Sequence, residues 1–278
     1  MIWEKMELEL ERLPRAQKKV ARYMVDNPSE SLFMTSQQLG ANSETSEATV
    51  IRLATTLGFA GFPEFKQALQ DEAKDSLSTF GRLQRHMSTV RTGNLLSDVI
   101  AAEIDKASAC LQQTDDNRIR ALAGEICRAA GGVYIVGLRS ARSLAVYMQF
   151  YLSWFLPNVY VPENDSLETY LVSAPKNSLL IGISFPRYTR LTLDCIRLAK
   201  RIGLKTAAIT DSDASPLAAE ADLSVTVPCV HVAHIDSLMI PFGMANALLI
   251  EVTSQLGPRA LERLGELEKI WSSGSTYC

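Results

Sequence analysis

The 278-residue chain lacks several features that would place it in a specialised class of protein. No apolar run approaches the roughly 18–20 residues that a membrane-spanning helix needs. The five cysteines are scattered, with no C-x-x-C pair and no histidine at ligand spacing, so the sequence predicts neither structural zinc nor a disulfide framework. The first residues resemble an acidic amphipathic helix rather than a signal peptide. We therefore expect a cytoplasmic protein without membrane association, metal or cofactor.

An excess of positive charge, common in nucleic-acid-binding proteins, is also missing. The net charge is −3, and residues 1–80, with nine basic and twelve acidic residues, are net −3 as well. DNA binding would therefore depend on local basic stripes, which can suffice because phosphate contacts act within about a Debye length. One such stripe lies on the helix expected at 14–26, and it consists of Arg15, Lys18, Lys19 and Arg22.

The segment 43–59 predicts a helix with one apolar face. Ser46 is placed to cap this helix through its hydroxyl, and Glu47 and Thr49 fall in the first turn. Apolar residues then recur at helical spacing, at Val50, Leu53, Ala54 and Leu57. A shorter helix at 35–41 precedes it, which gives the outline of a helix-turn-helix. Glu44 occupies the tight position of the turn, where it has to adopt an unfavourable φ.

The outer face of the second helix carries Ser46, Glu47, Thr49 and Arg52, residue types that read DNA in a helix-turn-helix. A solvated helical hairpin is the alternative interpretation. Lys66 is expected near this helix, on the next helix of the chain, which should run from Pro63 to about residue 75. Together these features favour an all-α DNA-binding domain over 1–77, followed by a linker at 78–94.

Short apolar runs alternate with helices from Gly131 onward. The strands are expected at 133–136, 158–161, 179–183, 206–210 and 223–227. They lack internal alternation, so they predict a five-stranded parallel sheet covered on both faces, a three-layer αβα domain over 95–278. Its ligand belongs at the carboxyl ends of the strands. The final helices, expected at 236–256 and 258–271, are strongly apolar around residues such as Leu248 and Ile250. Such faces suggest burial against another subunit as readily as against the sheet. We expect a homo-oligomer, either a dimer or a tetramer, with Leu248 at its interface.

Polar residues follow two of these strands. Arg139 and Ser140 follow the first strand, and Ser184, Arg187 and Thr189 follow the third. Hydroxyl groups, free N–H groups at a helix start and guanidinium groups make a strong anion site. The alternative is that Ser140 and Thr189 only cap the helices that follow them.

The first half of the chain resembles the N-terminal domain of RpiR/MurR-type bacterial transcriptional regulators. The resemblance rests on Thr45–Val50 with Arg52, on the run Leu57-Gly58-Phe59-x-Gly61-Phe62-x-Glu64-Phe65, and on Leu13-Pro14 and Asn27-Pro28. That family joins a helix-turn-helix to a sugar-isomerase (SIS) domain that senses phosphorylated sugars. The resemblance implies operator DNA as a partner, with candidate contacts at Ser46, Glu47, Thr49, Arg52, Lys66, Arg15, Lys18 and Lys19.

The second half is similar to an SIS domain over about residues 95–256. The matching segments are 133–137 with Ser140, 181–184 with Thr189, 208–211, and Ser215–Ala218 with Ala221-Asp222. The family's hydroxyls that hold the sugar phosphate correspond by position to Ser140, Ser184 and Thr189. The resemblance therefore implies a small phosphorylated effector.

The chain departs from the family in both of these loops. Arg139 stands where a glycine is usual, and Pro186 and Arg187 replace the second Ser and the Gly of Ser-x-Ser-Gly-x-Thr. Arginine suits bidentate recognition of carboxylate or phosphate. We therefore expect an effector that is more anionic than a neutral-headed sugar monophosphate, or one that is not a sugar phosphate.

A cytosolic sugar-phosphate isomerase with a helical appendage is the alternative function. Isomerisation needs a general base, usually Glu or His. The candidates are His86, His231, His234, Glu163 and Glu168. None lies in a recognisable catalytic pattern, so the sequence favours a regulator that is not an enzyme.

Overall fold

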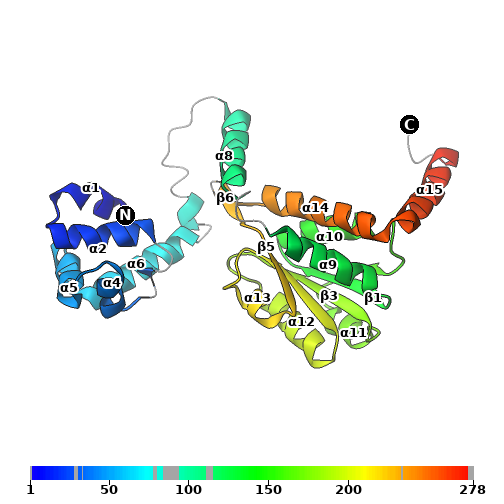
Figure 1. Ribbon diagram of the computed structural model, residues 1–278, viewed down its shortest axis with the longest axis horizontal. Helices are drawn as coiled ribbons and strands as arrows, with labels where there is room; N and C mark the ends of the chain where they lie inside the picture. Colours follow the sequence, from blue (N-terminus) through cyan, green and yellow to red (C-terminus); the bar gives the residue numbers. More distant parts are fainter. Residues whose placement is uncertain are drawn as a thin grey trace. The chain divides into compact units, whose positions relative to one another are not determined.

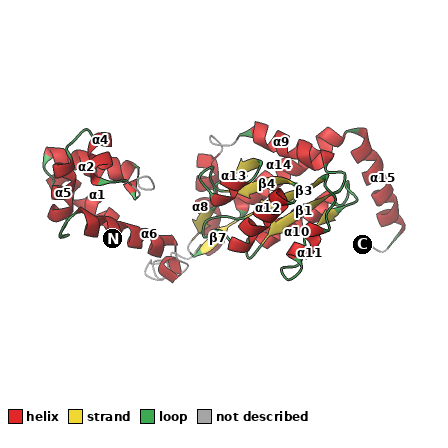
Figure 2. Ribbon diagram, turned by 90° about the horizontal axis from the view of Figure 1, so that it is seen from below, coloured by secondary structure: helices red, strands yellow, loops and turns green. Residues whose placement is uncertain are grey.

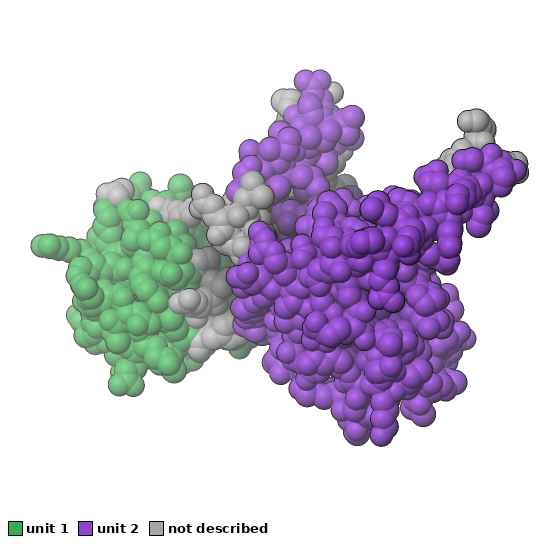
Figure 3. Space-filling view, turned by 45° about the vertical axis from the view of Figure 1, so that its right-hand side comes forward, with its two compact units in different colours: residues 1–89 green, residues 90–278 purple. Residues whose placement is uncertain are grey.

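The computed structural model describes residues 2–27, 31–32, 34–77, 80–83, 94–110, 115–232 and 234–274. The chain divides into two compact units, Met1–Thr89 and Val90–Cys278 (Figure 3). Most of the segment predicted as a linker, 78–94, lies outside the described residues. Within it, residues 80–83 are helical.

The described residues of the first unit form helices. These are α1 (Ile2–Glu9), the 3-10 turn η1 (Leu10–Arg12), α2 (Arg15–Asp26), α4 (Ser36–Asn42), α5 (Glu47–Thr56) and α6 (Phe62–Leu77). They agree with the predicted helices to within a few residues. Their apolar faces share one core, in which Met6, Met24, Leu39 and Phe65 are fully buried. The rings of Phe59 and Phe62 lie 5.2 and 6.4 Å from that of Phe65, so the repeated phenylalanines of the 57–65 run pack together.

The helices α4 and α5 form the predicted helix-turn-helix. A Cβ on Gly40 would lie 3.0 Å from the Glu47 backbone nitrogen, so the absence of a side chain lets α4 approach the start of α5. The predicted apolar face of α5 is confirmed, since Val50, Leu53 and Ala54 are fully buried. Glu44 has φ 53°, the unfavourable conformation expected for it.

Two details of the predicted α5 are wrong. Thr49 is only 7% exposed, so it does not belong to the outer face. It lies one turn from the buried Leu53, and residues four apart share a helix face. Ser46 holds the N-cap position as predicted, but its hydroxyl makes no capping hydrogen bond. It lies instead 3.0 Å from the Thr49 hydroxyl, and the two side chains satisfy each other.

Glu44 provides a test of backbone strain in the turn. A left-handed conformation costs a residue with a Cβ about 1–2 kcal/mol, so Glu44→Gly should make the first unit more stable by about 1 kcal/mol. Glu44→Ala is the matched control, because it also loses the Lys19 ion pair but keeps the Cβ. Amide hydrogen exchange in α4 and α5 measures the effect on this unit alone. Equal protection in the two variants would show that the turn is not strained.

The second unit is built on the predicted five-stranded parallel sheet, which is confirmed (Figure 2). Its strands are β1 (Gly132–Gly137), β2 (Val159–Tyr160), β3 (Ser178–Ile183), β4 (Lys205–Thr210) and β5 (Leu223–Thr226). The order is β2-β1-β3-β4-β5, so the chain reverses its direction of winding at β1. Gly137 is in register with Ile183, so β1 and β3 end together. Ligands of such sheets bind at this switch point.

Helices cover both faces of the sheet, which confirms the predicted three layers (Figure 1). One face packs against α9 (Asp116–Arg128), α10 (Ala141–Leu152) and α14 (Met239–Leu256). The other packs against α11 (Leu167–Val172), α12 (Arg190–Arg201) and α13 (Pro216–Glu220). The short helices α11 and α13 were not predicted. The unit begins with α8 (Leu95–Cys110) and ends with α15 (Pro258–Ser273).

A small antiparallel hairpin, β6 (Val230–Val232) with β7 (Ile235–Ser237), was also not predicted. The helix expected to begin at 236 begins instead at Met239, because residues 236–237 belong to β7. The hairpin contacts α8 through β6. It therefore joins the first helix of the unit to the last helix that covers the sheet.

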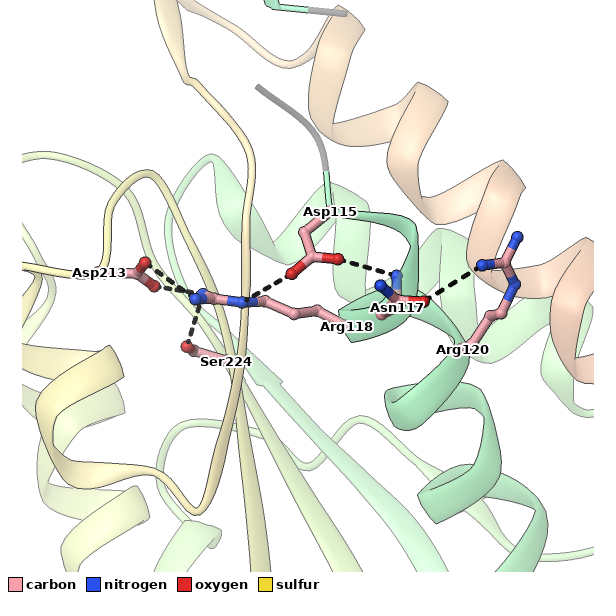
Figure 4. A network of polar contacts seen from close by, with 6 residues as sticks. All are labelled: Asp115, Asn117, Arg118, Arg120, Asp213 and Ser224. Atoms are coloured by element: carbon pink, nitrogen blue, oxygen red, sulfur yellow. Dashed lines mark hydrogen bonds and ion pairs between the residues drawn. The ribbon is translucent and has the colours of Figure 1, made fainter. Parts of the chain in front are cut away.

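Arg118 at the start of α9 fixes the loop that follows β4 (Figure 4). Its guanidinium binds both carboxylate oxygens of Asp213 and lies 3.5 Å from the Ser224 hydroxyl on β5. The hydrogen bond from Arg118 lowers the pKa of Asp213. This contact stabilises the carboxyl edge of the sheet beside the candidate site.

No described helix is long and apolar enough to cross a membrane.

Candidate functional site

A cavity of about 200 Å³ lies at the carboxyl ends of β1 and β3. It is lined by Leu138, Arg139, Ser140, Ala141, Ser184, Phe185, Pro186, Arg187, Thr189, Cys229 and Asp236. The structure thus brings together all five residues that the sequence predicted to bind a ligand. We call this cavity the switch-point pocket. Its size suits a small metabolite rather than a larger ligand.

Two helices begin at the switch-point pocket. Ser140 is the N-cap of α10 and Thr189 is the N-cap of α12, yet neither hydroxyl makes a capping hydrogen bond. The alternative in which both residues act through capping bonds therefore receives no support. Ser184 is 4% exposed, and its hydroxyl accepts a hydrogen bond of 2.9 Å from the Thr189 backbone N–H. The positive ends of two helices favour an anion between them.

Arg139 and Arg187 are held in a conformation that normally requires glycine. Their φ angles are 57° and 67°, in the left-handed region that costs a residue with a Cβ about 1–2 kcal/mol. These are the two positions at which the sequence departs from the family's glycines. At both positions the loops combine a glycine-like backbone conformation with a guanidinium side chain. Such strain at a ligand site points to a function for the side chain.

The loop 184–189 is attached to the end of β4 by Tyr188. Its hydroxyl donates a 2.9 Å hydrogen bond to Asp211 Oδ1, which also accepts one from the Thr210 hydroxyl. Burial, followed by this bond, raises the pKa of Tyr188 well above its usual value. The phenol therefore stays protonated and acts as a donor that orients the loop.

Sequence reasoning missed two residues of the pocket, Cys229 and Asp236. Cys229 lies just before the β6–β7 hairpin and Asp236 lies on β7, 40 and 47 residues after Thr189 in the chain. Asp236 Oδ2 lies 4.0 Å from Arg187 Nη2, and Asp236 Oδ1 lies 3.0 Å from His231 Nδ1. Nothing in the sequence predicts Asp236 at this site, because only the fold of the β6–β7 hairpin places it beside Arg187.

The residues considered as general bases are placed differently. Glu163 is exposed and forms an ion pair of 2.6 Å with Arg142. Glu168 lies exposed in the first turn of α11. His231 approaches the switch-point pocket through Asp236, whereas His86 lies outside the described residues. Within the described ranges, no cluster of His, Cys, Asp and Glu is arranged to hold a metal ion.

The outer face of α5 exposes Ser46, Glu47 and Arg52. Glu47 Oε1 accepts a hydrogen bond of 2.6 Å from the Ser36 hydroxyl on α4, and Arg52 Nε donates one of 3.1 Å to the Ala48 carbonyl. Lys66 is half-buried and donates a hydrogen bond of 2.8 Å to the Met34 carbonyl. Its ammonium therefore supports the segment before α4.

A groove in the first unit gathers the basic residues of α2. Arg15, Lys18, Lys19 and Arg22 line it together with the turn residues Asn42, Ser43 and Glu44. Lys19 and Glu44 form an ion pair of 3.1 Å across the groove. The basic stripe predicted on this helix thus adjoins the turn that leads into α5.

The two units match two known families of domain. Residues 1–76 match the helix-turn-helix domain of the rpiR family, and residues 127–250 match the SIS domain. The chain is 24% identical to the transcriptional regulator HexR of Escherichia coli over 81% of this chain and 76% of HexR. It is 24% identical to the transcriptional regulator YbbH of Bacillus subtilis over 87% of this chain and 84% of YbbH.

Solved structures give the same result. The sugar isomerase domain of an RpiR transcription factor from Sphaerobacter thermophilus is 29% identical, with a TM-score of 0.59, and covers 64% of this chain and 99% of its own. The NanR protein of Vibrio vulnificus, solved with ManNAc-6P, shares the fold at 16% identity and a TM-score of 0.59 over 98% of both chains. A helix-turn-helix joined to an SIS domain defines a class of bacterial regulators. This chain belongs to the RpiR family of DNA-binding transcriptional regulators.

Proposed function

We propose that the protein controls transcription by binding operator DNA through α5, and that a small anion in the switch-point pocket adjusts this binding. The observation that carries the effector proposal is the pair of arginines at left-handed φ beside two helix N-termini. The effector is a phosphorylated sugar or a related sugar acid. The site of action is the bacterial cytoplasm, where operator DNA and phosphorylated metabolites are both found.

The DNA proposal rests on the exposed face of α5 and on the basic groove beside it. Second helices of helix-turn-helix domains enter the major groove with their N-terminal residues toward the bases. Glu47 and Arg52 are exposed at this face, and Arg15, Lys18 and Lys19 line the neighbouring groove, where we expect them to contact phosphates. Base contacts then specify the sequence, and lysine contacts supply salt-dependent affinity.

Arg52→Ala tests the reading helix. If Arg52 reads a guanine edge, the variant should lose about 1–3 kcal/mol of operator binding and become less selective. Fluorescence anisotropy at fixed salt, with an operator duplex selected from a random pool, measures both. Lys18→Ala is the comparison, because loss of a phosphate contact weakens all sequences alike. Unchanged affinity in Arg52→Ala would remove α5 from the interface.

The effector proposal follows from the charge of the pocket. Arg139 and Arg187 provide two permanent positive charges, whereas Asp236 is the single acidic residue among those lining it. Phosphate suits the helix N-termini and the hydroxyls of Ser140 and Thr189. A second anionic group, such as a carboxylate, suits the guanidinium groups. The relative NanR, solved with a sugar phosphate, shows that this fold accommodates such a molecule.

Arg187→Ala and Arg187→Gly separate the guanidinium from the backbone. Both should lose about 2–4 kcal/mol of effector binding, the range for truncating one partner of a charged pair. Only the glycine variant should also gain about 1–2 kcal/mol of stability, because φ 67° suits glycine. Calorimetry with inorganic phosphate, glucose 6-phosphate and 6-phosphogluconate measures binding, and thermal unfolding measures stability. If both variants bind as wild type does, the arginines are structural and a plain sugar phosphate is the better effector.

We also propose a homo-oligomer formed by the second unit. Leu248, which the sequence placed among candidate interface residues, is fully buried in the sheet core and cannot contact a partner. Apolar side chains nevertheless remain exposed nearby, with Phe150 on α10 at 56%, Ile250 on α14 at 66% and Leu261 on α15 at 75%. An aromatic row that includes Tyr151, Trp154 and Trp271 continues this surface. Paired DNA-binding units also suit a two-fold operator.

Ile250→Asp tests this surface. A charge there should dissociate the oligomer and weaken operator binding while the fold persists, because the side chain is exposed. Leu248→Asp is the contrasting variant, since it should unfold the second unit. Sedimentation of both proteins and of the wild type distinguishes the two effects. A monomeric wild type at micromolar concentration would contradict the proposal.

A turnover assay separates a regulator from an isomerase. The wild-type protein is incubated with glucose 6-phosphate and the formation of ketose phosphate is followed. We expect binding without turnover. Conversion that His231→Gln abolishes would instead favour the isomerase.

A further inference from the structure

Asp236 is an acidic residue placed where the proposed effector would put its own anion. Its carboxylate approaches Arg187 to 4.0 Å from inside the pocket, and its other oxygen lies 3.0 Å from His231 Nδ1. It is three-quarters buried, whereas the Arg187 side chain is half exposed. The carboxylate is therefore held by its hairpin, and the guanidinium is free to turn toward another anion.

We propose that Asp236 is a built-in competitor of the effector, and that its displacement from Arg187 moves the β6–β7 hairpin against α8. This inference rests on the proposed function, since it assumes an anionic effector in the switch-point pocket. An anion that binds Arg187 draws the guanidinium away from Asp236, which keeps His231 as a neighbour, and places a like charge beside the carboxylate. Both effects disfavour the observed position of the hairpin.

The hairpin is connected to α8 next to Asp236. Ser237 is 6% exposed, and its hydroxyl donates a 2.7 Å hydrogen bond to Glu103 Oε2 on α8. The same hydroxyl accepts a bond of 3.2 Å from the Met239 N–H at the start of α14. Ser237 is the next residue after Asp236, so a shift of Asp236 acts directly on this partly buried contact with α8.

The position of α8 in the chain makes this contact informative. It is the first helix of the second unit, and the chain reaches it from the DNA-binding unit through residues 78–94. A change at Glu103 therefore reaches the segment that leads to the DNA-binding unit. Coupling of this kind is reciprocal, so operator binding should alter effector affinity by the same factor.

Asp236→Asn tests the competition. The amide keeps the shape of the carboxylate and removes its charge, so the variant should bind the tightest of inorganic phosphate, glucose 6-phosphate and 6-phosphogluconate at least about fivefold more strongly than wild type. Asp194→Asn, on the exposed face of α12, removes an equal charge away from the pocket and should bind as wild type does. Equal or weaker binding by Asp236→Asn would overturn the proposal.

Ser237→Ala and Glu103→Ala test the transmission. Both should bind the anion with wild-type affinity, yet the anion should change their operator affinity much less. Ser254→Ala, an exposed serine on α14, is the control and should respond fully. A full response in both Ser237→Ala and Glu103→Ala would refute the route through α8.

The outcomes also separate this inference from the function on which it rests. A wild-type protein that binds none of the three anions, or no operator, would refute the proposed function and the inference with it. A wild-type protein that binds both, with unchanged affinity in Asp236→Asn, would refute the inference alone. The oligomeric state of each variant, measured by sedimentation, excludes a loss of assembly as the cause.

Discussion

The switch in winding direction at β1 is the constraint on which the second unit depends. Because β2 and β3 flank β1, the helices that follow β1 and β3 leave the sheet on opposite faces, α10 on one and α12 on the other. Their N-termini diverge from a common edge and leave a cavity between two loops. The position of the candidate site is therefore a consequence of topology, and the side chains that line it decide its chemistry.

The two arginines show how a family site can change its chemistry without changing its backbone. Gly137 still lets α10 approach β1, since a Cβ there would lie 2.5 Å from the Ala141 carbonyl oxygen. Around it the loops keep left-handed φ at Arg139 and Arg187. Each residue costs about 1–2 kcal/mol in that conformation. A substitution at such positions is disfavoured by backbone strain, and a role of the guanidinium groups in effector binding, as proposed, would offset that cost.

Much of this architecture was predictable because it depends on local pattern. The five strands followed from uninterrupted apolar runs, and the pocket residues followed from the rule that parallel strands end at one edge. Thr49 was misplaced because its polar side chain suggested an outward position, whereas its spacing from Leu53 places it inside. The hairpin and Asp236 were not predictable, since short strands after Pro228 carry little periodicity and the contact with Arg187 exists only in three dimensions. The prediction that Leu248 lies at a subunit interface was wrong for a similar reason, because an apolar helix face can pack against the core or against a partner.

The acidic residue in the pocket explains why an anion site can also be a switch. A pocket with only arginines and helix N-termini would have no acidic side chain that an incoming anion could displace. Asp236 gives Arg187 a partner within the protein, so in the proposed switch the two arrangements differ in which carboxylate or phosphate the guanidinium faces. A ligand can shift such an equilibrium only by its differential affinity for the two states. The proposed competition would supply that difference at one atom pair, and the partly buried Ser237–Glu103 hydrogen bond would connect it to α8.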